Sequence, residues 1–209
     1  MGAKYANINI KMRDAEKLKG VLSEYYQGVK EKNLKLFSRF KEMPDDLLKM
    51  ICKSHSEYVI CQFTEKWLTI LNANFGWESV DAVALAISKH INEPILTIGY
   101  FDDELVTMSI IENNKILTKH ISGLGLSAYE IDAEKEDAII FNEYLELDQE
   151  LDVIEEILSI RLNHFTELDD KIQRLSELTG IQLGVGIEDY DFYISENKIA
   201  FEVIDFECS

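Results

Sequence analysis

Serine and histidine are the residues whose spacing would reveal nucleophilic catalysis in this 209-residue sequence. A hydrolytic serine needs a histidine base, and one common arrangement places the serine in a Gly-x-Ser-x-Gly elbow. The sequence has no such elbow, and Ser122-Gly123 lacks the flanking pattern. The four histidines, His55, His90, His120 and His164, stand 30 to 44 residues apart in unrelated predicted elements. We therefore predict no catalytic residue, although the spacing leaves a triad assembled in three dimensions open.

Glycine pairs and acidic loops are the places where phosphate or a hard cation could bind. Gly123-Leu124-Gly125 and Gly184-Val185-Gly186 lack the Lys-Ser/Thr of a phosphate loop, and neither opens a clear helix. Glu188-Asp189-Tyr190-Asp191 lacks the spaced ligands and the glycine of an EF-hand. We interpret the glycines as turn or bulge residues and the acidic run as a solvated loop.

Cysteine and histidine could together form a tetrahedral zinc site. Cys52 and His55 are three residues apart, and Cys61 and Cys208 could complete four ligands. However, Cys52 continues an apolar helical stripe and Cys61 lies in a strand-like run, which is typical of buried free cysteines. We expect no metal and no cofactor. Three cysteines without a disulfide spacing favour a reducing cytoplasm.

The overall charge limits the partners that the chain can bind. Lys and Arg number 21 against 39 Asp and Glu, which gives a net charge of −18. Nucleic acid and anionic membranes are disfavoured, because both require a basic surface. The sequence has no apolar run of membrane-spanning length and no signal peptide at its start, so we predict a soluble, cytoplasmic protein. A basic protein partner is electrostatically favoured.

The negative charge is concentrated in the second half of the chain. Residues 5–72 carry a net charge of +3, whereas residues 126–205 carry −17. Within 134–156, ten of twenty-three residues are Asp or Glu and only Lys135 is basic. Helical spacing turns the apolar residues of this segment inward, including Ile140, Leu151, Ile154 and Ile157. The predicted partner-binding face then consists of Asp148, Glu150, Asp152, Glu155 and Glu156.

Hydrophobic periodicity predicts an α+β fold in one compact domain covering residues 1–209. A helix is expected from Asp14 to Gly28, another from Pro44, one from Ser79, and later helices capped by Asp132, Asp148 and Thr166. The predicted strands are Tyr5–Met12, the hairpin Tyr58–Phe63 with Trp67–Leu71, the meander Ile95–Phe101, Leu105–Ile111 and Ile116–Ile121, then Leu126–Ile131, and a last hairpin of Asp191–Ile194 with Ile199–Phe206. We expect an antiparallel sheet with the helices on one face.

A short repeat suggests internal duplication. Asp14-Ala15-Glu16-Lys17 recurs as Asp132-Ala133-Glu134-Lys135, each time between a predicted strand and helix. The predicted units are 5–72 and 126–205, flanking a helix-plus-meander segment, 78–122. Acidic residues favour first helical turns in general, so chance recurrence is the alternative.

Residues 84–122 carry a resemblance through Ile87-Ser88-Lys89, Pro94-Ile95-Leu96 and Tyr100-Phe101-Asp102-Asp103. This segment resembles uncharacterised bacterial α+β proteins, some of presumed toxin-immunity type, and it transfers no functional residue. We predict a non-enzymatic, intracellular protein-binding role, with immunity-like neutralisation of a basic partner as one form of it. The alternatives are an enzyme with a carboxylate and histidine site that the sequence does not reveal, and a small-ligand sensor with a pocket near Trp67 and Trp77.

Overall fold

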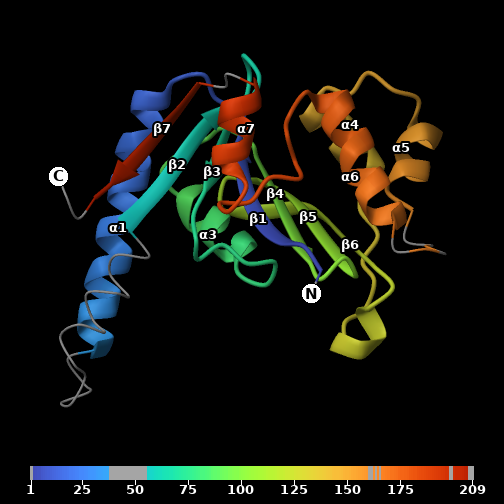
Figure 1. Ribbon diagram of the computed structural model, residues 1–209, viewed down its shortest axis with the longest axis horizontal. Helices are drawn as coiled ribbons and strands as arrows, with labels where there is room; N and C mark the ends of the chain where they lie inside the picture. Colours follow the sequence, from blue (N-terminus) through green and yellow to red (C-terminus); the bar gives the residue numbers. More distant parts are fainter. Residues whose placement is uncertain are drawn as a thin grey trace.

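Seven strands form one antiparallel sheet in the computed structural model, which describes residues 2–37, 56–159, 162, 164, 166–197 and 200–206 (Figure 1). The strands are β1 (Lys4–Ile10), β2 (Glu57–Gln62), β3 (Leu68–Leu71), β4 (Ile95–Phe101), β5 (Leu105–Glu112), β6 (Lys115–Ser122) and β7 (Ala200–Asp205). Their order across the sheet is β6-β5-β4-β1-β3-β2-β7. The sheet therefore takes strands from both ends of the described chain, and an α+β fold is confirmed.

The meander β4–β5–β6 was predicted with its turns, and it is confirmed. Asp102 and Asp103 both have φ of 59°, and Asn113 and Asn114 have φ of 50° and 59°. Two successive left-handed residues are the signature of a type I′ turn, whose twist matches that of the flanking strands. Asp and Asn tolerate this conformation better than other non-glycine residues, which explains why these turns could be recognised.

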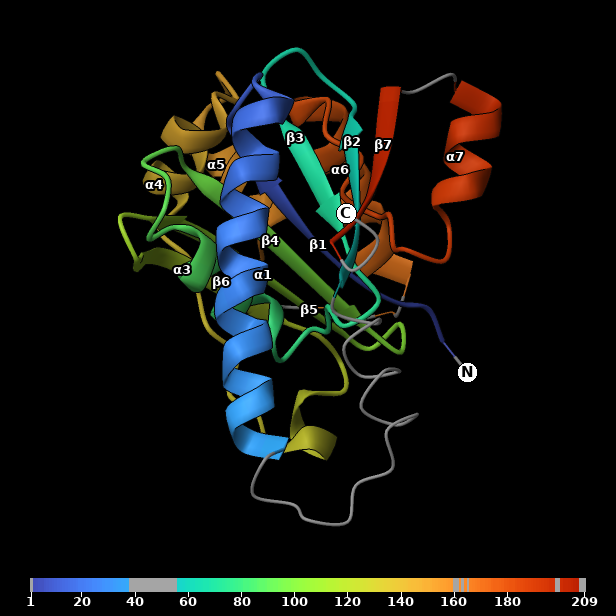
Figure 2. The same cartoon turned by 90° about the vertical axis from the view of Figure 1, so that its left-hand side faces the viewer.

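Helices cover both faces of the sheet, rather than one face as predicted. They are α1 (Ala15–Phe37), α3 (Val80–Ile87), α4 (Ala138–Leu145), α5 (Leu151–Ile157), α6 (Thr166–Thr179) and α7 (Tyr190–Asn197). One buried cluster joins α1 and α3 to the sheet, and the other joins α4, α5 and α6 to the opposite face (Figures 1 and 2). The reason lies in β4, where Ile95 and Leu96 point to opposite faces and both are buried.

Several predicted boundaries are wrong. Helix α1 does not end at Gly28 but continues to Phe37. Gly28 faces open space, and the segment that follows it is rich in lysine and leucine, which favour helix. Helix α4 begins after Asp137, whose carboxylate accepts hydrogen bonds from the amides of Ile139 and Ile140, and not after Asp132. Asp148 does not cap α5, since it has a left-handed φ of 51° and the N-cap is Glu150.

The internal duplication is not seen among the described residues. Residues 5–72 supply β1, α1, β2 and β3, whereas 126–205 supply a 3₁₀ turn (Leu126–Tyr129), four helices and β7. The predicted strand 126–131 is that turn, and the predicted strand Asp191–Ile194 lies within α7. The shared Asp-Ala-Glu-Lys thus precedes different structures. The helix predicted from Pro44 lies outside the described residues.

We predict that Gly99→Ala destabilises the protein. A Cβ at Gly99 would lie 2.6 Å from both Trp77 Cα and Thr107 Oγ1, so the loop carrying Trp77 must shift away from β4. Overpacking of this kind costs about 1–3 kcal/mol, which urea unfolding would measure. Gly20→Ala is the control, because its Cβ meets nothing within 4 Å and alanine favours helix. Equal stability of the two variants would contradict this packing.

Candidate functional site

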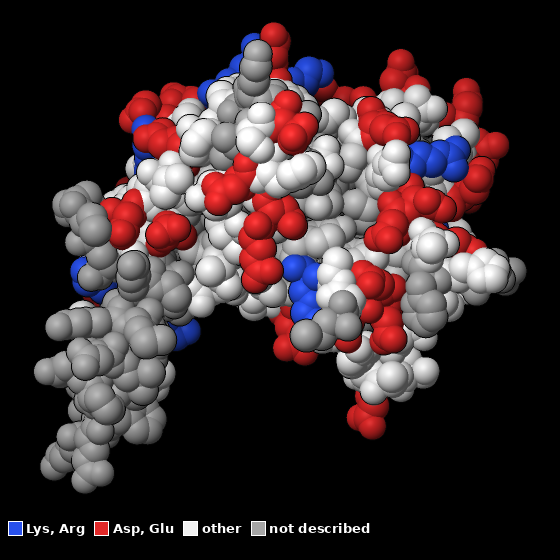
Figure 3. All heavy atoms as spheres, in the orientation of Figure 1, with Lys and Arg blue, Asp and Glu red and all other residues white. Residues whose placement is uncertain are grey.

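The five acidic residues predicted to form a partner-binding face are all exposed in the structure. Asp148 and Glu150 lie in the connection between α4 and α5, and Asp152, Glu155 and Glu156 lie on α5. Ile154 and Ile157 anchor α5 in the core, so its carboxylates project away from the sheet. Figure 3 shows that acidic side chains outnumber basic ones over α4, α5 and α6.

Two basic side chains lie beside this face. Lys135 Nζ is 3.7 Å from Glu155 Oε1, and Arg174 Nη1 is 3.2 Å from Glu156 Oε1. All four side chains are about half exposed or more, so water and salt screen these pairs. In the part of the chain that is described, no ion pair of 4.0 Å or less reaches Asp148, Glu150 or Asp152. The face therefore keeps its negative potential.

A shallow groove with a mixed lining runs between α4 and α5. Its volume is about 360 Å³, and its lining consists of Ile139, Asn142, Glu143, Glu146, Asp148 and Leu151. Two of these side chains are large, apolar and unusually exposed, at 60% for Ile139 and 43% for Leu151. We refer to these six residues as the acidic groove. It places apolar surface inside a carboxylate rim, and only Asp148 belongs to the predicted face.

Sequence reasoning missed both apolar residues of the acidic groove. Leu151 was predicted to point inward, yet it is the first residue of α5 and is 43% exposed, because this end of the helix extends past the part of α5 that covers the core. Ile139 and Ile140 are adjacent in α4, and neighbouring helical residues point about 100° apart, so both cannot face the core. That adjacency was the available signal for an exposed isoleucine.

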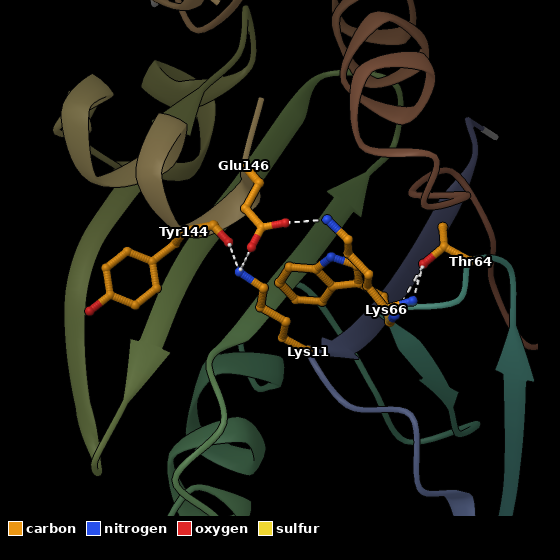
Figure 4. Close-up of polar contacts among 6 residues, drawn as sticks. Lys11, Thr64, Lys66, Tyr144 and Glu146 are labelled. Carbon is orange, nitrogen blue, oxygen red and sulfur yellow. Dashed lines mark hydrogen bonds and ion pairs between the residues drawn. The ribbon is translucent and has the colours of Figure 1, made fainter. Parts of the chain in front are cut away.

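Glu146 ties the acidic groove to the sheet (Figure 4). Its carboxylate lies 2.8 Å from Lys11 Nζ, just after β1, and 2.5 Å from Lys66 Nζ, in the β2–β3 turn. Lys11 also donates to the carbonyl of Tyr144 at 3.2 Å, and Thr64 Oγ1 stabilises the turn by accepting the Lys66 amide at 3.1 Å. The hydrogen bonds from Lys11 and Lys66 lower the pKa of Glu146 to about 2. The C-terminal end of α4 is thus held by two cations from the other half of the chain.

We predict that Glu146→Gln lowers stability in a pH-dependent way. The folded pKa is depressed, so the stabilisation is present above about pH 4.5 and is lost as pH falls towards 2. Because the carboxylate side chain is 46% exposed, screening reduces the loss at pH 7 to about 0.5–1 kcal/mol. Urea unfolding at pH 7 and pH 3 would measure the difference from wild type. The double variant Lys11→Gln with Glu146→Gln should lose less free energy of unfolding than the sum of the two single variants. Full additivity of these losses would contradict the pairing of the two side chains.

A buried chain of polar residues connects β6 to the segment before α4. His120 Nδ1 is 2.6 Å from Glu136 Oε2, and His120 Nε2 is 2.8 Å from Ser122 Oγ. This is the order of groups in a Ser-His-carboxylate triad. However, Ser122 and His120 are both 0% exposed, so substrate has no route to the Ser122 hydroxyl. These hydrogen bonds pair His120, Ser122 and one oxygen of Glu136 and hold Glu136 to the edge strand β6, whereas the buried Glu136 Oε1 has no hydrogen-bond partner among the described residues.

We predict that this buried pair is energetically coupled. Glu136→Leu leaves His120 Nδ1 without its carboxylate partner, and such a loss costs about 3–5 kcal/mol. The double variant His120→Leu with Glu136→Leu should cost clearly less than the sum of the two single variants, because neither partner is then stranded. Urea unfolding of the four proteins would give the coupling free energy. A coupling of zero would show that the two residues do not interact.

The remaining residues flagged in the sequence do not form a common site. Trp67 packs in the core under α4–α6, whereas Trp77 lies against Gly99 on the opposite face of the sheet, so the two indoles do not line one pocket. Burial raises the pKa of the Cys61 thiol to about 11, which makes it a poor nucleophile. Cys52, His55 and Cys208 lie outside the described residues.

The other two histidines lie apart from His120. His90 is 2.8 Å from Glu24, between α3 and α1, and His164 is exposed. Where the chain is described, no group of three or more His, Cys, Asp or Glu is placed to hold a metal ion.

No family model, no curated protein and no solved structure matches this chain. Of the helices described, none has both the length and the apolar character needed to cross a bilayer.

Proposed function

We propose that this protein binds a basic protein partner through the acidic groove and the neighbouring carboxylates of α5, without catalysing a reaction. The observation that carries the proposal is the exposure of Ile139 and Leu151 inside a ring of carboxylates. Protein interfaces commonly combine a central apolar contact with a charged rim. Here the apolar pair supplies affinity, and the carboxylates select a cationic surface and speed its association.

Solubility alone accounts less well for this arrangement. A surface selected for solubility has no need of two large exposed apolar side chains within the dense acidic segment 134–156. Crowded like charges also repel one another on helices, by a few tenths of a kcal/mol per pair. A cationic partner relieves that repulsion while it covers the apolar residues.

Asn142 helps to shape the acidic groove. Its Nδ2 donates to the carbonyl of Gln149 at 2.9 Å, which ties α4 to the connection that leads into α5. The carboxylates around Ile139 and Leu151 are therefore held by the backbone of this connection. Immunity-like neutralisation of a basic protein is one form of the proposed binding, in which occlusion of the partner's cationic surface is itself the activity.

The enzyme and sensor alternatives have weaker support. The one carboxylate–histidine arrangement among the described residues that resembles a triad is Glu136–His120–Ser122, which is buried. The pocket suggested for a sensor required Trp67 and Trp77 to face each other, and they lie on opposite sides of the sheet.

The proposal predicts that charge reversal on α5 abolishes binding. Tagged protein would capture partners from lysate of the native cells at low salt, and each captured protein would be purified and its Kd measured by calorimetry. Wild type should bind a protein of high isoelectric point, with affinity that falls as salt rises. The variant Asp152→Lys, Glu155→Lys, Glu156→Lys should bind at least about a hundredfold more weakly, equivalent to about 2.7 kcal/mol.

A matched control separates the site from net charge. Glu188→Lys, Asp191→Lys, Glu196→Lys makes the same change in net charge, at exposed positions in and before α7. This variant should keep most of the affinity. Ile139→Ser with Leu151→Ser should also weaken binding, because it removes the apolar contact and leaves every carboxylate. If both charge variants lose affinity equally, or no captured protein depends on α5, the proposed function is wrong.

A further inference from the structure

A second concave site lies on the flank of α6 that faces away from α5. This hollow has a volume of about 480 Å³ and is lined by Tyr5, Asp169, Ile172, Gln173, Ser176, Glu177, Gln182 and Gly184. Figure 3 shows a hollow between α6 and the segment leading into α7, with acidic side chains on both sides. Arg174, which reaches α5, and Asp169, which lines the hollow, project from different sides of α6. The hollow is therefore separate from the acidic groove.

The floor of the hollow is built from buried hydrogen bonds. Asn7, fully buried on β1, donates from Nδ2 to the carbonyls of Leu183 and Val185 at 2.7 and 2.9 Å. The Leu183 amide in turn donates to Ser176 Oγ at 3.1 Å. These bonds hold the segment that contains Gly184 against both the sheet and α6. The shape of the hollow is consequently fixed before any ligand arrives.

A pair of stacked tyrosines forms one wall of the hollow and orients one of its carboxylates. Tyr5 stacks on Tyr100 with ring centroids 4.8 Å apart and an interplanar angle of 2°. The buried Tyr100 hydroxyl donates to Asp169 Oδ1 at 2.5 Å. Burial and the bond to Asp169 raise the pKa of Tyr100, so the hydroxyl of Tyr100 remains a donor to Asp169. Asp169 is thus oriented while its other oxygen stays available at the exposed end of the side chain.

The polar lining of the hollow is rich in acceptors and holds no cation. Asp169, Gln173 and Glu177 follow one another at every fourth residue of α6, so they form a row about 12 Å long. Gln173 Nε2 donates to Glu177 Oε1 at 3.0 Å, so the amide oxygen of Gln173 adds an acceptor to this row. Aromatic faces and carboxylates together are the surroundings that alkylammonium and guanidinium groups prefer.

We propose that this hollow beside α6 is a binding site for a guanidinium or alkylammonium group. The cation lies against Tyr5 and hydrogen-bonds to the row Asp169, Gln173 and Glu177. Such a group can belong to a free small molecule or to an arginine or lysine side chain presented by a peptide. The proposal does not depend on the acidic groove, because none of its lining residues is shared with that groove.

The test is an NMR titration of the ¹⁵N-labelled full chain with three single-group probes. They are N-acetyl-arginine methylamide, spermidine, and N-acetyl-citrulline methylamide as the uncharged analogue. If the site takes a free cation, the arginine probe or spermidine should cause saturable shifts and the citrulline probe should not. These shifts should be confined to residues 169–186 and the start of β1. A hexa-arginine peptide is the second arm, and shifts at the hollow with this peptide alone identify a presented side chain.

Matched variants test whether the cationic probes bind in the hollow. Asp169→Asn with Glu177→Gln keeps the shape and the Tyr100 acceptor but removes both charges, and it should weaken the apparent Kd at least about tenfold. Asp170→Asn with Glu167→Gln removes the same charge from the same helix outside the hollow, and it should change Kd by less than about twofold. Gly184→Leu should block the hollow without any change in charge, because the leucine side chain occupies its space. The fold should tolerate this substitution, because a Cβ at Gly184 meets its nearest atoms at ordinary distances of 3.6 and 3.7 Å.

Several results would overturn the proposal. They are equal weakening by the two charge variants, undiminished binding by Gly184→Leu, binding of citrulline as strong as that of arginine, or no saturable shift at the hollow with any probe. Shifts confined to the acidic groove, residues 139–151, would reject this site while leaving the proposed function intact. Retained signal dispersion in each variant shows that the fold has survived.

Discussion

Burial of both faces of the central strands is the constraint on which the rest of this structure depends. β4 is buried at six successive positions, from Ile95 to Tyr100, so neither face of the sheet can be left to water. One helical layer covers one face only. The chain meets this requirement by placing α1 and α3 on one side and α4, α5 and α6 on the other.

The distribution of charge follows from that two-sided architecture. The acidic second half supplies an entire outer layer, so its carboxylates gather on one side of the molecule instead of alternating with the basic residues of the first half. The two halves exchange ion pairs where their elements meet, as between Lys11 and Glu146 at 2.8 Å and between Lys19 and Glu202 at 2.6 Å. Away from these meeting points the acidic side chains of α5 are exposed.

Local signals in the sequence predicted the local parts of the structure. The meander was recognised because acidic and amide residues tolerate left-handed turns, and α6 because Leu168, Ile172 and Leu175 share a helical face that ends at Gly180. The helices on both faces and the pairing of β2 with β7 depend on contacts between distant segments, which periodicity does not encode. The last predicted hairpin failed because Asp191–Ile194, a short apolar and aromatic run, satisfies strand and helix patterns equally.

The candidate sites likewise contain residues that local sequence signals predict and residues that only the tertiary structure brings together. The exposed carboxylates of α5 were predicted, since one amphipathic helix determines them. Ile139 could have been found from its position next to Ile140, and the two-residue spacing of His120 and Ser122 on one strand could have suggested their contact. The positions of Glu136 beside His120 and of Tyr5 beside α6 could not be predicted from the sequence, because each depends on how distant segments pack together.

The edge pairing of β2 with β7 has a consequence for how the molecule assembles. Gln62 pairs with Ala200, and Glu57 pairs with Asp205, so the two strands are separated by more than a hundred residues of intervening chain. Pairings of such long sequence separation form slowly, because loop-closure entropy must be overcome before any contact rewards it. Until β7 arrives, β2 is an open edge able to recruit strands from other molecules. A nascent chain in which only the first six strands have formed therefore exposes the edge of β2, and docking of β7 covers that edge and makes β7 the outer strand.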